Sequence, residues 1–325
     1  MEDLKFNVLR LLSEKYDFIS GEKLASELGV SRTAVWKAVK SLRSRGYSIE
    51  AVPRRGYRLV KTPDVIFPQE IKRGLRTRVF GRKIVYFEEV ASTNDVAKEL
   101  ASQGAPEGTL VIAEMQTRGR GRMSREWFSP RGGLWFSIIL RPDMTPGEVP
   151  LLALMLGVGV AKALLREGLR CHLKWPNDVL VDGRKVCGIL TELDAEMDVV
   201  NYVIGGIGIN VNNEVKDFPM EFRHLATTVK AELGRKVSRV VLLKHVLEEL
   251  ERTYDGLNEK GGSVVLDEWR RLSSTLGKRV RVVTHGRTIE GLALDVADNG
   301  ALLIELENGR IEKIISGDCL HVGKI

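Results

Sequence analysis

Two arginines lie in a segment whose composition suits the binding of a negatively charged ligand. The segment QTRGRGRMSREWFSPRGG, residues 116–133, alternates Arg120 and Arg122 with the glycines Gly119 and Gly121. Glycine lets the backbone approach a ligand closely, and a guanidinium group donates paired hydrogen bonds to carboxylate or phosphate oxygens. Because connections this long are usually functional or disordered, we interpret the segment as a mobile cationic lid. An RNA-binding arginine tail is the alternative.

A lysine and two tryptophans could add to such a site. Lys174 is expected at the end of a short strand, in the motif KWPND, where Trp175 and Pro176 should form a stiff turn. An ammonium group held there is a fixed point charge, unless Lys174 is a surface residue paired with Asp178. Trp127 offers a flat apolar face for a nucleotide base, or it packs in the core.

Small polar residues and glycines could complete a site for a small molecule. Ser92, Thr93 and Asn94 open a predicted helix, although Ser92 or Thr93 could be no more than its N-cap. The later strand NYVIGGIGINVN ends at Asn210, and its glycines permit close approach of a ligand or mark a bulge. These glycines are Gly205, Gly206 and Gly208.

Several common catalytic sites are absent from the sequence. It contains no GxxxxGK[ST] loop and no GxGxxG motif after a strand, which argues against P-loop and Rossmann nucleotide binding. Five histidines and three cysteines fall outside metal-ligand spacing, so we predict no metal ligands in the protein. A covalent nucleophile is not evident either. The chemistry would therefore depend on positioning and on cations directed at developing negative charge.

The positioning elements are preceded by a basic N-terminal region. Residues 1–62 hold 13 Lys/Arg and 7 Asp/Glu, a net charge of +6 out of +7 for the chain. Apolar residues at helical spacing, Leu4, Val8, Leu11 and Leu12, predict a first helix. A second helix is predicted over 21–28, ended by Gly29, and a third after Ser31, with Val35, Val39 and Leu42 facing inward. Two strands within 47–59, joined at Pro53, complete a winged helix-turn-helix.

The charge of this region predicts DNA binding through the third helix and the wing. A protein-interaction module with a merely solvated basic face is the alternative. We expect Trp36 to pack. The residues assigned to DNA are Ser31, Arg32, Thr33, Lys37, Lys40, Arg54 and Arg55.

The rest of the chain predicts an α+β fold in two further domains. After a linker around residues 62–68, strands alternate with helices over 63–275, including a buried apolar helix within 149–165 and a hairpin turn at Asp182 and Gly183. Residues 276–325 are predicted to form short strands with turns at 285–286, 298–300 and 308–309, which indicates a small β-barrel. Asp318 is assigned to turn capping, with a role at the site as the alternative.

The motifs GRGRMSREWFSP, KWPNDV and GGIGINVN follow one another behind a winged helix, with STN upstream. In this order they resemble the bifunctional biotin protein ligases that double as biotin repressors, and the match spans nearly the whole chain. The resemblance implies a central class II synthetase-like ligase domain with a mixed sheet and an SH3-like C-terminal barrel. It also implies a two-step reaction, in which biotin and ATP give biotinyl-AMP, and a lysine of a carrier protein then takes the biotin.

The resemblance also implies roles for individual residues. Lys174, Arg122 and Arg120 would be catalytic, and Mg²⁺ would accompany ATP. Where the family often has arginine and glycine, this chain has Met123 and Ser124, which would stiffen the lid and alter retention of the adenylate. Biotin would be held by Ser92, Thr93, Asn94, Gln116, Arg120, Gly121, Arg122, Lys174, Gly206 and Gly208, and ATP or the adenylate by Gly119, Arg122, Trp127, Lys174 and Asn210.

The expected partners are the biotin carboxyl carrier domain of a biotin-dependent carboxylase, operator DNA and a second copy of the chain. The N-terminus lacks the features of a signal peptide, so we expect a cytoplasmic protein without a membrane partner. Two alternatives stay open at this point. One is a lipoate or octanoate ligase of the same fold, and the other is a regulator that binds a small molecule without catalysis.

Overall fold

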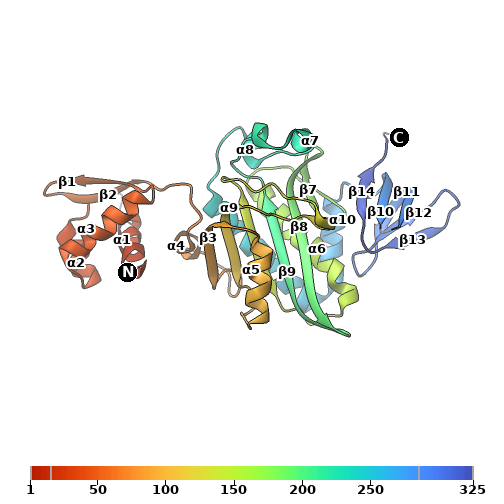
Figure 1. The fold of residues 1–325 in the computed structure, drawn as a ribbon, viewed down its shortest axis with the longest axis horizontal. Coiled ribbons are helices and arrows are strands. Elements are labelled where there is room, and N and C mark those ends of the chain that lie inside the picture. Colours follow the sequence, from red (N-terminus) through yellow and green to blue (C-terminus); the bar gives the residue numbers. More distant parts are fainter. Residues whose placement is uncertain (1, 15–16, 285, 324–325) are drawn as a thin grey trace. The chain divides into compact units, whose positions relative to one another are not determined.

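The structure, a computed structural model, describes residues 2–14, 17–284 and 286–323 (Figure 1). The chain divides into two compact units, Met1–Val65 and Ile66–Ile325. The division falls inside the segment predicted as a linker.

The first unit is a winged helix-turn-helix, as predicted. Ser31 Oγ accepts a hydrogen bond from the Ala34 amide at 3.1 Å and caps the third helix. Val35, Val39 and Leu42 on the inner face of that helix are buried, as the pattern predicted. The elements are α1 (Glu2–Glu14), α2 (Gly21–Leu28), α3 (Arg32–Ser44) and the antiparallel strands β1 (Ser48–Val52) and β2 (Gly56–Lys61).

One prediction for this unit is wrong. Trp36 does not pack, because 51% of the residue is exposed on the outer face of α3. The helical spacing explains the error in physical terms. Trp36 lies one residue after the buried Val35 and two before the buried Ala38, and on a helix neighbouring positions point in different directions.

The second unit is built on a mixed sheet of seven strands in the order β3-β4-β5-β9-β8-β7-β6. Only β3 and β4 run parallel, and every other neighbouring pair is antiparallel. The strands are β3 (Ile84–Val90), β4 (Leu110–Gln116), β5 (Leu134–Leu140), β6 (His172–Lys174), β7 (Asp178–Val181), β8 (Arg184–Glu196) and β9 (Val199–Ile209).

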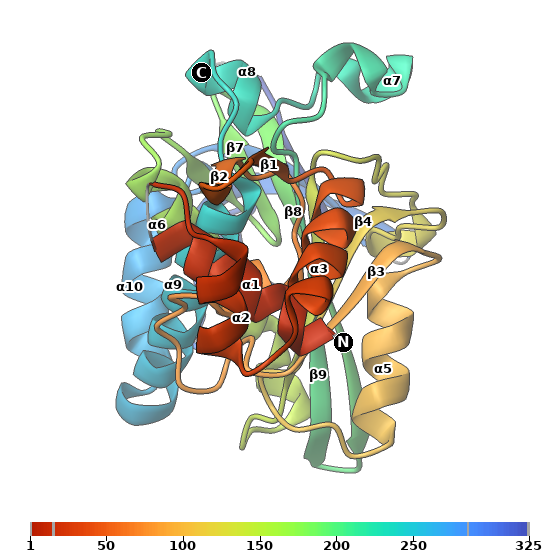
Figure 2. The same ribbon diagram turned by 90° about the vertical axis from the view of Figure 1, so that its left-hand side faces the viewer.

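Alternation along the strands gives the sheet two apolar faces, each covered by helices. On one face Ile112 and Ile207 join the main core with α6 (Val149–Arg166), α9 (Arg239–Lys260) and α10 (Gly262–Leu272). On the other, Val111 and Ile204 pack against α5 (Thr93–Ser102). Figure 2 shows α5 on one side of the sheet and α9 and α10 on the other.

The most apolar helix of the described chain belongs to the core. Residues Pro146–Arg166 are long and apolar enough to cross a membrane by length and composition, but 78% of this window is buried inside the fold. Such burial is that of a core helix. Short elements complete the unit: α4 (Pro68–Lys72), α7 (Met220–Arg223), α8 (Val229–Leu233) and the 3₁₀ turns Arg122–Ser124, Pro146–Glu148 and Val215–Asp217.

The C-terminal strands form one antiparallel sheet in the order β13-β12-β11-β10-β14. It is joined to the central sheet through Trp175, whose amide donates to Thr275 Oγ1 at 3.0 Å and whose indole Nε1 donates to the Gly300 carbonyl at 3.0 Å. The strands are β10 (Arg279–Thr284), β11 (Arg287–Val296), β12 (Leu302–Glu305), β13 (Ile311–Ile314) and β14 (Asp318–His321). Residue 285, in the turn predicted at 285–286, lies outside the residues that the structure describes.

Candidate active site

A cavity of about 840 Å³ lies against the face of the central sheet that α5 covers. Its volume is within the range of about 300–1,000 Å³ typical of small-molecule sites. Residues of the arginine segment, the KWPND turn and β14 all line it, so segments distant in sequence meet there. Of the predicted ligand-site residues, the lining includes Ser92, Thr93, Asn94, Gln116, Arg120, Gly121, Arg122, Trp127, Lys174, Gly206, Gly208 and Asn210.

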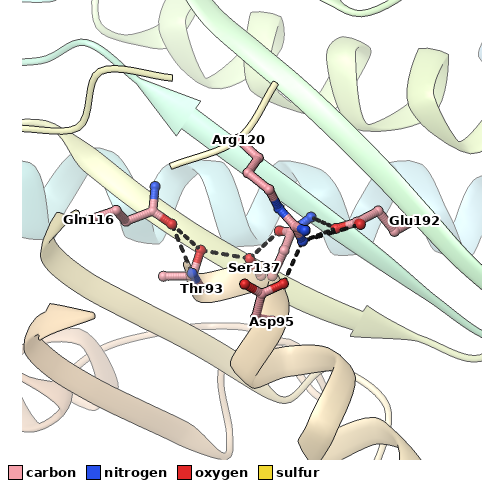
Figure 3. A network of polar contacts seen from close by, with 7 residues as sticks. Thr93, Asp95, Gln116, Arg120, Ser137 and Glu192 are labelled. Carbon is pink, nitrogen blue, oxygen red and sulfur yellow. Dashed lines mark hydrogen bonds and ion pairs between the residues drawn. The ribbon is translucent and has the colours of Figure 1, made fainter. Parts of the chain in front are cut away.

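One end of the cavity carries uncharged polar groups joined in a network (Figure 3). Gln116 Oε1 accepts from the Thr93 amide at 2.8 Å and from Thr93 Oγ1 at 3.1 Å. Ser137 Oγ lies 2.8 Å from Thr93 Oγ1 and 2.6 Å from Asn94 Oδ1. Ser92 is the N-cap residue of α5, yet its side chain makes no capping hydrogen bond. Hydrogen bonds therefore hold Thr93, Asn94 and Gln116 in place, whereas no side-chain cap bond holds Ser92.

Arg120 is engaged by two carboxylates that the sequence did not indicate. Its Nη2 lies 2.5 Å from Asp95 Oδ1 and 3.3 Å from both oxygens of Glu192 (Figure 3). Glu192 also accepts from Asn94 Nδ2 at 2.6 Å. Arg120 thus lines the cavity, but its guanidinium already has anionic partners within the protein.

Arg122 and Lys174 are the cations better placed for an external anion. Arg122 Nη1 donates to the Gly317 carbonyl at 3.1 Å, and burial lowers the pKa of its guanidinium, an effect opposed by Asp178. Lys174, at the end of β6, has no carboxylate within ion-pair distance in the part of the chain that the structure describes. The alternative pairing of Lys174 with Asp178 is wrong, since Asp178 pairs with Lys185 at 2.6 Å.

Glycines in the sheet make room for side chains that cover it. A Cβ on Gly206 would lie 2.1 Å from Asn94 Oδ1, and one on Gly208 would lie 2.3 Å from Trp127 Nε1. Gly188, paired with Gly208 across β8 and β9, also lies under the Trp127 ring. Any larger residue at these positions would displace Asn94 or Trp127. The contact of Gly206 and Gly208 with a ligand remains a prediction.

Trp127 lies flat in the cavity wall rather than in the core. Its ring meets Trp135 edge-on, with centroids 6.4 Å apart, and Lys185 Nζ is 5.0 Å from its centroid. The indole Nε1 is buried and has no hydrogen-bond partner among the described residues. This nitrogen lies against Gly208 of β9, since a Cβ at that position would be 2.3 Å from it, so the indole is packed against the sheet.

The arginine segment is folded back on itself. Gly121 N donates to the Arg125 carbonyl at 2.7 Å, and Trp127 N donates to the Gly119 carbonyl at 2.8 Å. Gly119, which was predicted to bind ATP or the adenylate, is not among the residues that line the cavity. A Cβ there would lie 2.4 Å from the Trp127 carbonyl oxygen, so the segment's own backbone requires this glycine. The mobility of the segment stays a prediction.

The departure from the family motif falls at the tip of this segment. Met123 and Ser124 have φ angles of 54° and 58°, in the left-handed region that glycine adopts most easily. Next to them, Arg125 forms an ion pair with Asp318 of β14. Asp318, which we assigned to turn capping, instead lines the cavity and holds the arginine segment.

The lining also contains residues that motif analysis missed. They include Arg125, Phe128, Asn177, Lys185, Gly188, Phe218, Phe222 and Leu225. Arg125, Phe128 and Asn177 lie within the arginine segment and the KWPND motif but were not singled out there, and only the fold brings the other residues to the cavity. No group of three or more His, Cys, Asp or Glu that could hold a metal ion occurs among residues 2–14, 17–284 and 286–323.

The predicted DNA-facing residues of the first unit are mostly exposed. Arg32, Thr33, Lys37 and Lys40 lie on the outer face of α3, and Arg54 lies at the tip of the wing with φ 66°. Ser31 is used to cap α3. Arg55 is held by Asp17 at 3.6 Å and by the ring of Phe18 at 4.3 Å.

Comparison with known proteins gives the same order of domains along the chain. Family models match residues 86–210 as the biotin/lipoate A/B protein ligase family, residues 5–58 as an HTH domain and residues 275–322 as a biotin protein ligase C terminal domain. The bifunctional ligase/repressor BirA of Bacillus subtilis is 43% identical over 97% of this chain and 98% of its own length. That of Escherichia coli is 29% identical over 93% of this chain and 92% of its own.

Solved structures give the same result for the larger part of the chain. The biotin protein ligase from Aquifex aeolicus in complex with biotin and ATP is 33% identical, with a TM-score of 0.63. The match covers 74% of this chain and 98% of the Aquifex protein.

Proposed function

The chain belongs to the family of bifunctional biotin ligases and repressors, and we propose that its cavity is the site where biotin and ATP are joined. The enzyme is an ATP-dependent biotin protein ligase. A carboxylate oxygen of biotin attacks the α-phosphorus of ATP, and the bond from that phosphorus to the leaving pyrophosphate breaks. The neutral ε-amine of a carrier-domain lysine then attacks the acyl carbon of biotinyl-5'-AMP, AMP leaves, and the amine releases a proton to solvent.

Both steps develop negative charge on phosphate oxygens, and two cations of the cavity suit that charge. We assign it to Lys174 and Arg122, because preorganised cations in a partly dehydrated site stabilise a transition state more than they would in water. Arg120 would act mainly by holding the arginine segment through Asp95 and Glu192. A reaction that needs no covalent nucleophile fits this set of residues.

The polar network suits the ureido ring of biotin, which has both N–H donors and a carbonyl acceptor. Ser92, Thr93, Asn94 and Gln116 offer hydroxyl and amide groups of both kinds. Gly206 and Gly208 would lie beside the ring, with Arg120, Gly121 and Arg122 over it. Trp127 suits the adenine end, and Asn210 the phosphates.

Mg²⁺ would enter with ATP. Since the described residues form no metal cluster, the ion would be held chiefly by the phosphate oxygens. Bound there, it would neutralise the leaving pyrophosphate.

The observation that carries the proposal is that Lys174, which has no carboxylate partner among the described residues, lines the same cavity as the polar network. We expect Lys174→Ala to lower biotin-dependent release of pyrophosphate by about 10²–10³-fold, the range for losing one group that stabilises developing charge. Lys98→Ala, on the exposed face of α5, is the control and should match the parent. Equal turnover in the Lys174 variant, with unchanged thermal unfolding, would contradict the assignment.

Two alternatives predict different products. A lipoate or octanoate ligase would transfer lipoate to an acceptor domain with ATP, and a non-catalytic regulator would release no pyrophosphate with any acid. Labelled biotin and labelled lipoate, offered separately with ATP and a carrier domain, distinguish all three. We expect transfer of biotin alone.

We further propose that the first unit binds operator DNA and that the protein acts as a biotin-responsive repressor. The exposed cations of α3 support this, as does the net charge of +6 over residues 1–62. A two-fold operator would require a homodimer. Three free cysteines, all buried, are compatible with a cytoplasmic location.

A further inference from the structure

Trp36 is a large aromatic residue on the outer face of α3 that the first unit does not use for its core. About half of the residue, 51%, is exposed, whereas the inner-face residues Val35, Ala38 and Val39 are at most 4% exposed. We propose that Trp36 reads the DNA sequence, by packing its indole against the 5-methyl groups of thymine in the major groove. The proposal rests on the DNA-binding function proposed above and adds a residue with a defined chemical target.

The helix holds Trp36 within a stripe of cations. Arg32 lies four residues before it and Lys40 four residues after it, so all three share one side of α3. Lys40 Nζ is 5.4 Å from the centroid of the indole ring. This cation–π contact limits the freedom of the side chain in advance, so less conformational entropy is lost when it meets a partner.

The surrounding charges identify the partner as a polyanion. Arg32 and Lys37 make no ion pair among the described residues and are exposed, which leaves both available for phosphates. A hydrophobic protein surface would bury Trp36 but would leave these cations without counter-charges. Duplex DNA supplies both, because phosphates flank the major groove and the thymine methyl is the apolar group on its floor.

The arginines of the wing differ from the cations of α3, because they already have partners within the first unit. Arg55 and Arg58 lie over the Phe18 ring at 4.3 and 4.7 Å, and each is also paired with a carboxylate, Asp17 and Glu50 respectively. These two arginines are therefore already engaged. We therefore assign recognition of the DNA base sequence to α3. Among the described residues of this helix, Trp36 is the one large apolar side chain that is exposed.

The test starts from the full-length protein with biotin and ATP and a pool of random duplexes, from which bound sequences are selected. In the selected duplex each thymine is replaced in turn by deoxyuridine, which removes only the 5-methyl group. We expect one or more replacements to weaken binding by the parent by about fourfold, the effect of burying one methyl group of about 0.8 kcal/mol. Trp36→Ala should bind the thymine duplex more weakly and should respond to none of these replacements.

Controls separate this inference from the function on which it rests. Val60→Ala removes another exposed apolar side chain of the same unit, outside α3, and should keep the parent's response to deoxyuridine. Circular dichroism of Trp36→Ala and Trp36→Phe tests whether both variants fold. Trp36→Phe keeps an aromatic ring and should keep part of the response to deoxyuridine.

Four results would overturn the proposal. If the parent selects no sequence, DNA recognition itself fails. If it selects a sequence but ignores every thymine methyl, or if Trp36→Ala retains the methyl response, DNA binding stands and the role of Trp36 is wrong. A shift of Trp36→Ala toward monomer in sedimentation, with unchanged DNA affinity, would assign the residue to an interface between copies.

Discussion

Arg120, although predicted to bind a ligand, forms ion pairs with two carboxylates of the protein itself. Its guanidinium spans the first turn of α5 and strand β8 through Asp95 and Glu192. The same Glu192 orients Asn94, which lies over Gly206. A single carboxylate therefore links the arginine segment to the polar end of the cavity, and in the proposed function Glu192 would act as a positioning residue for biotin.

Replacing Glu192 with glutamine should test that link. Glutamine keeps the size of the side chain and an acceptor oxygen but removes the charge, and a half-exposed ion pair such as Arg120–Glu192 contributes at most about 1 kcal/mol. We expect the KM for biotin to rise up to about fivefold with kcat nearly unchanged, because the anchor that Asn94 and Arg120 share is weakened while Lys174 is untouched. Steady-state release of pyrophosphate measures both constants. Glu196→Gln, exposed on the same strand, is the control and should match the parent. A KM of Glu192→Gln within twofold of the parent's would disprove the link.

Local motifs predicted one half of the site and missed the other for a physical reason. Arg122, Lys174 and Gly208 were recognisable because each lies in a short segment whose composition is unusual for a strand or a turn. Glu192 meets Asn94 across 98 residues, and that meeting depends on the register of β8 on β9. Register is a property of the folded sheet, so a lone glutamate in a strand carried no such information.

At the scale of elements, the arginine segment is fastened to β14. Arg125 pairs with Asp318, and Arg122 donates to the carbonyl of Gly317 at 3.1 Å. Two adjacent residues of the C-terminal sheet thus hold the segment that closes one wall of the cavity. The pattern of short strands predicted this sheet but not its contact with the segment, since the pairing joins residues that are far apart in sequence.

Removing the carboxylate should loosen the segment. In Asp318→Ala we expect trypsin to cleave within residues 118–125 about two- to fivefold faster than in the parent, because a half-exposed ion pair stabilises by at most about 1 kcal/mol. Mass spectrometry of the early fragments measures the rate. Asp298→Ala, in an exposed turn of the same sheet, should cleave like the parent. If Arg125→Ala and Asp318→Ala have fully additive effects in the double variant, the two side chains do not act as a pair.

The junction of β14 with the KWPND turn should make stability depend on pH. His321 Nε2 lies 3.3 Å from Thr275 Oγ1, which in turn accepts from the amide of Trp175. Burial, with smaller contributions from Lys278 and Lys174, lowers the pKa of His321 from 6.5 to about 4. Between these values the unfolded chain binds a proton that the folded chain does not, so stability falls as pH decreases from about 6.5 to about 4.

Urea unfolding at pH 7.5, 6 and 5 measures this dependence. The free energy of unfolding of the parent should decrease along this series, and the decrease should be smaller in His321→Gln, which cannot take up the proton. Carboxylates titrate in both proteins, so only the difference between them reports on His321. Parallel curves for the two proteins would show that His321 is not the group responsible.

At the scale of the whole molecule, the chain combines two units with separate cores. The first buries Val8, Leu24, Val35 and Ile49, and the second has its own clusters on both faces of the central sheet. The change in composition predicted this division, because the positive charge is concentrated before the linker while the ligase motifs all follow it.

The division predicts that ligation does not need the first unit. The Aquifex ligase matches 74% of this chain and 98% of its own length, so a ligase of this fold exists at a length close to that of the second unit. We expect a chain of residues 66–323 to release pyrophosphate with biotin within about threefold of the parent's rate, and to lose binding to the duplex selected by the full chain.

A chain with Arg32→Ala and Lys37→Ala is the matched control, because it keeps the first unit folded while removing two exposed cations. It should ligate normally and bind the duplex weakly with a shallower dependence on salt. Loss of ligation in the truncated chain, with its thermal unfolding intact, would mean that the first unit contributes to catalysis.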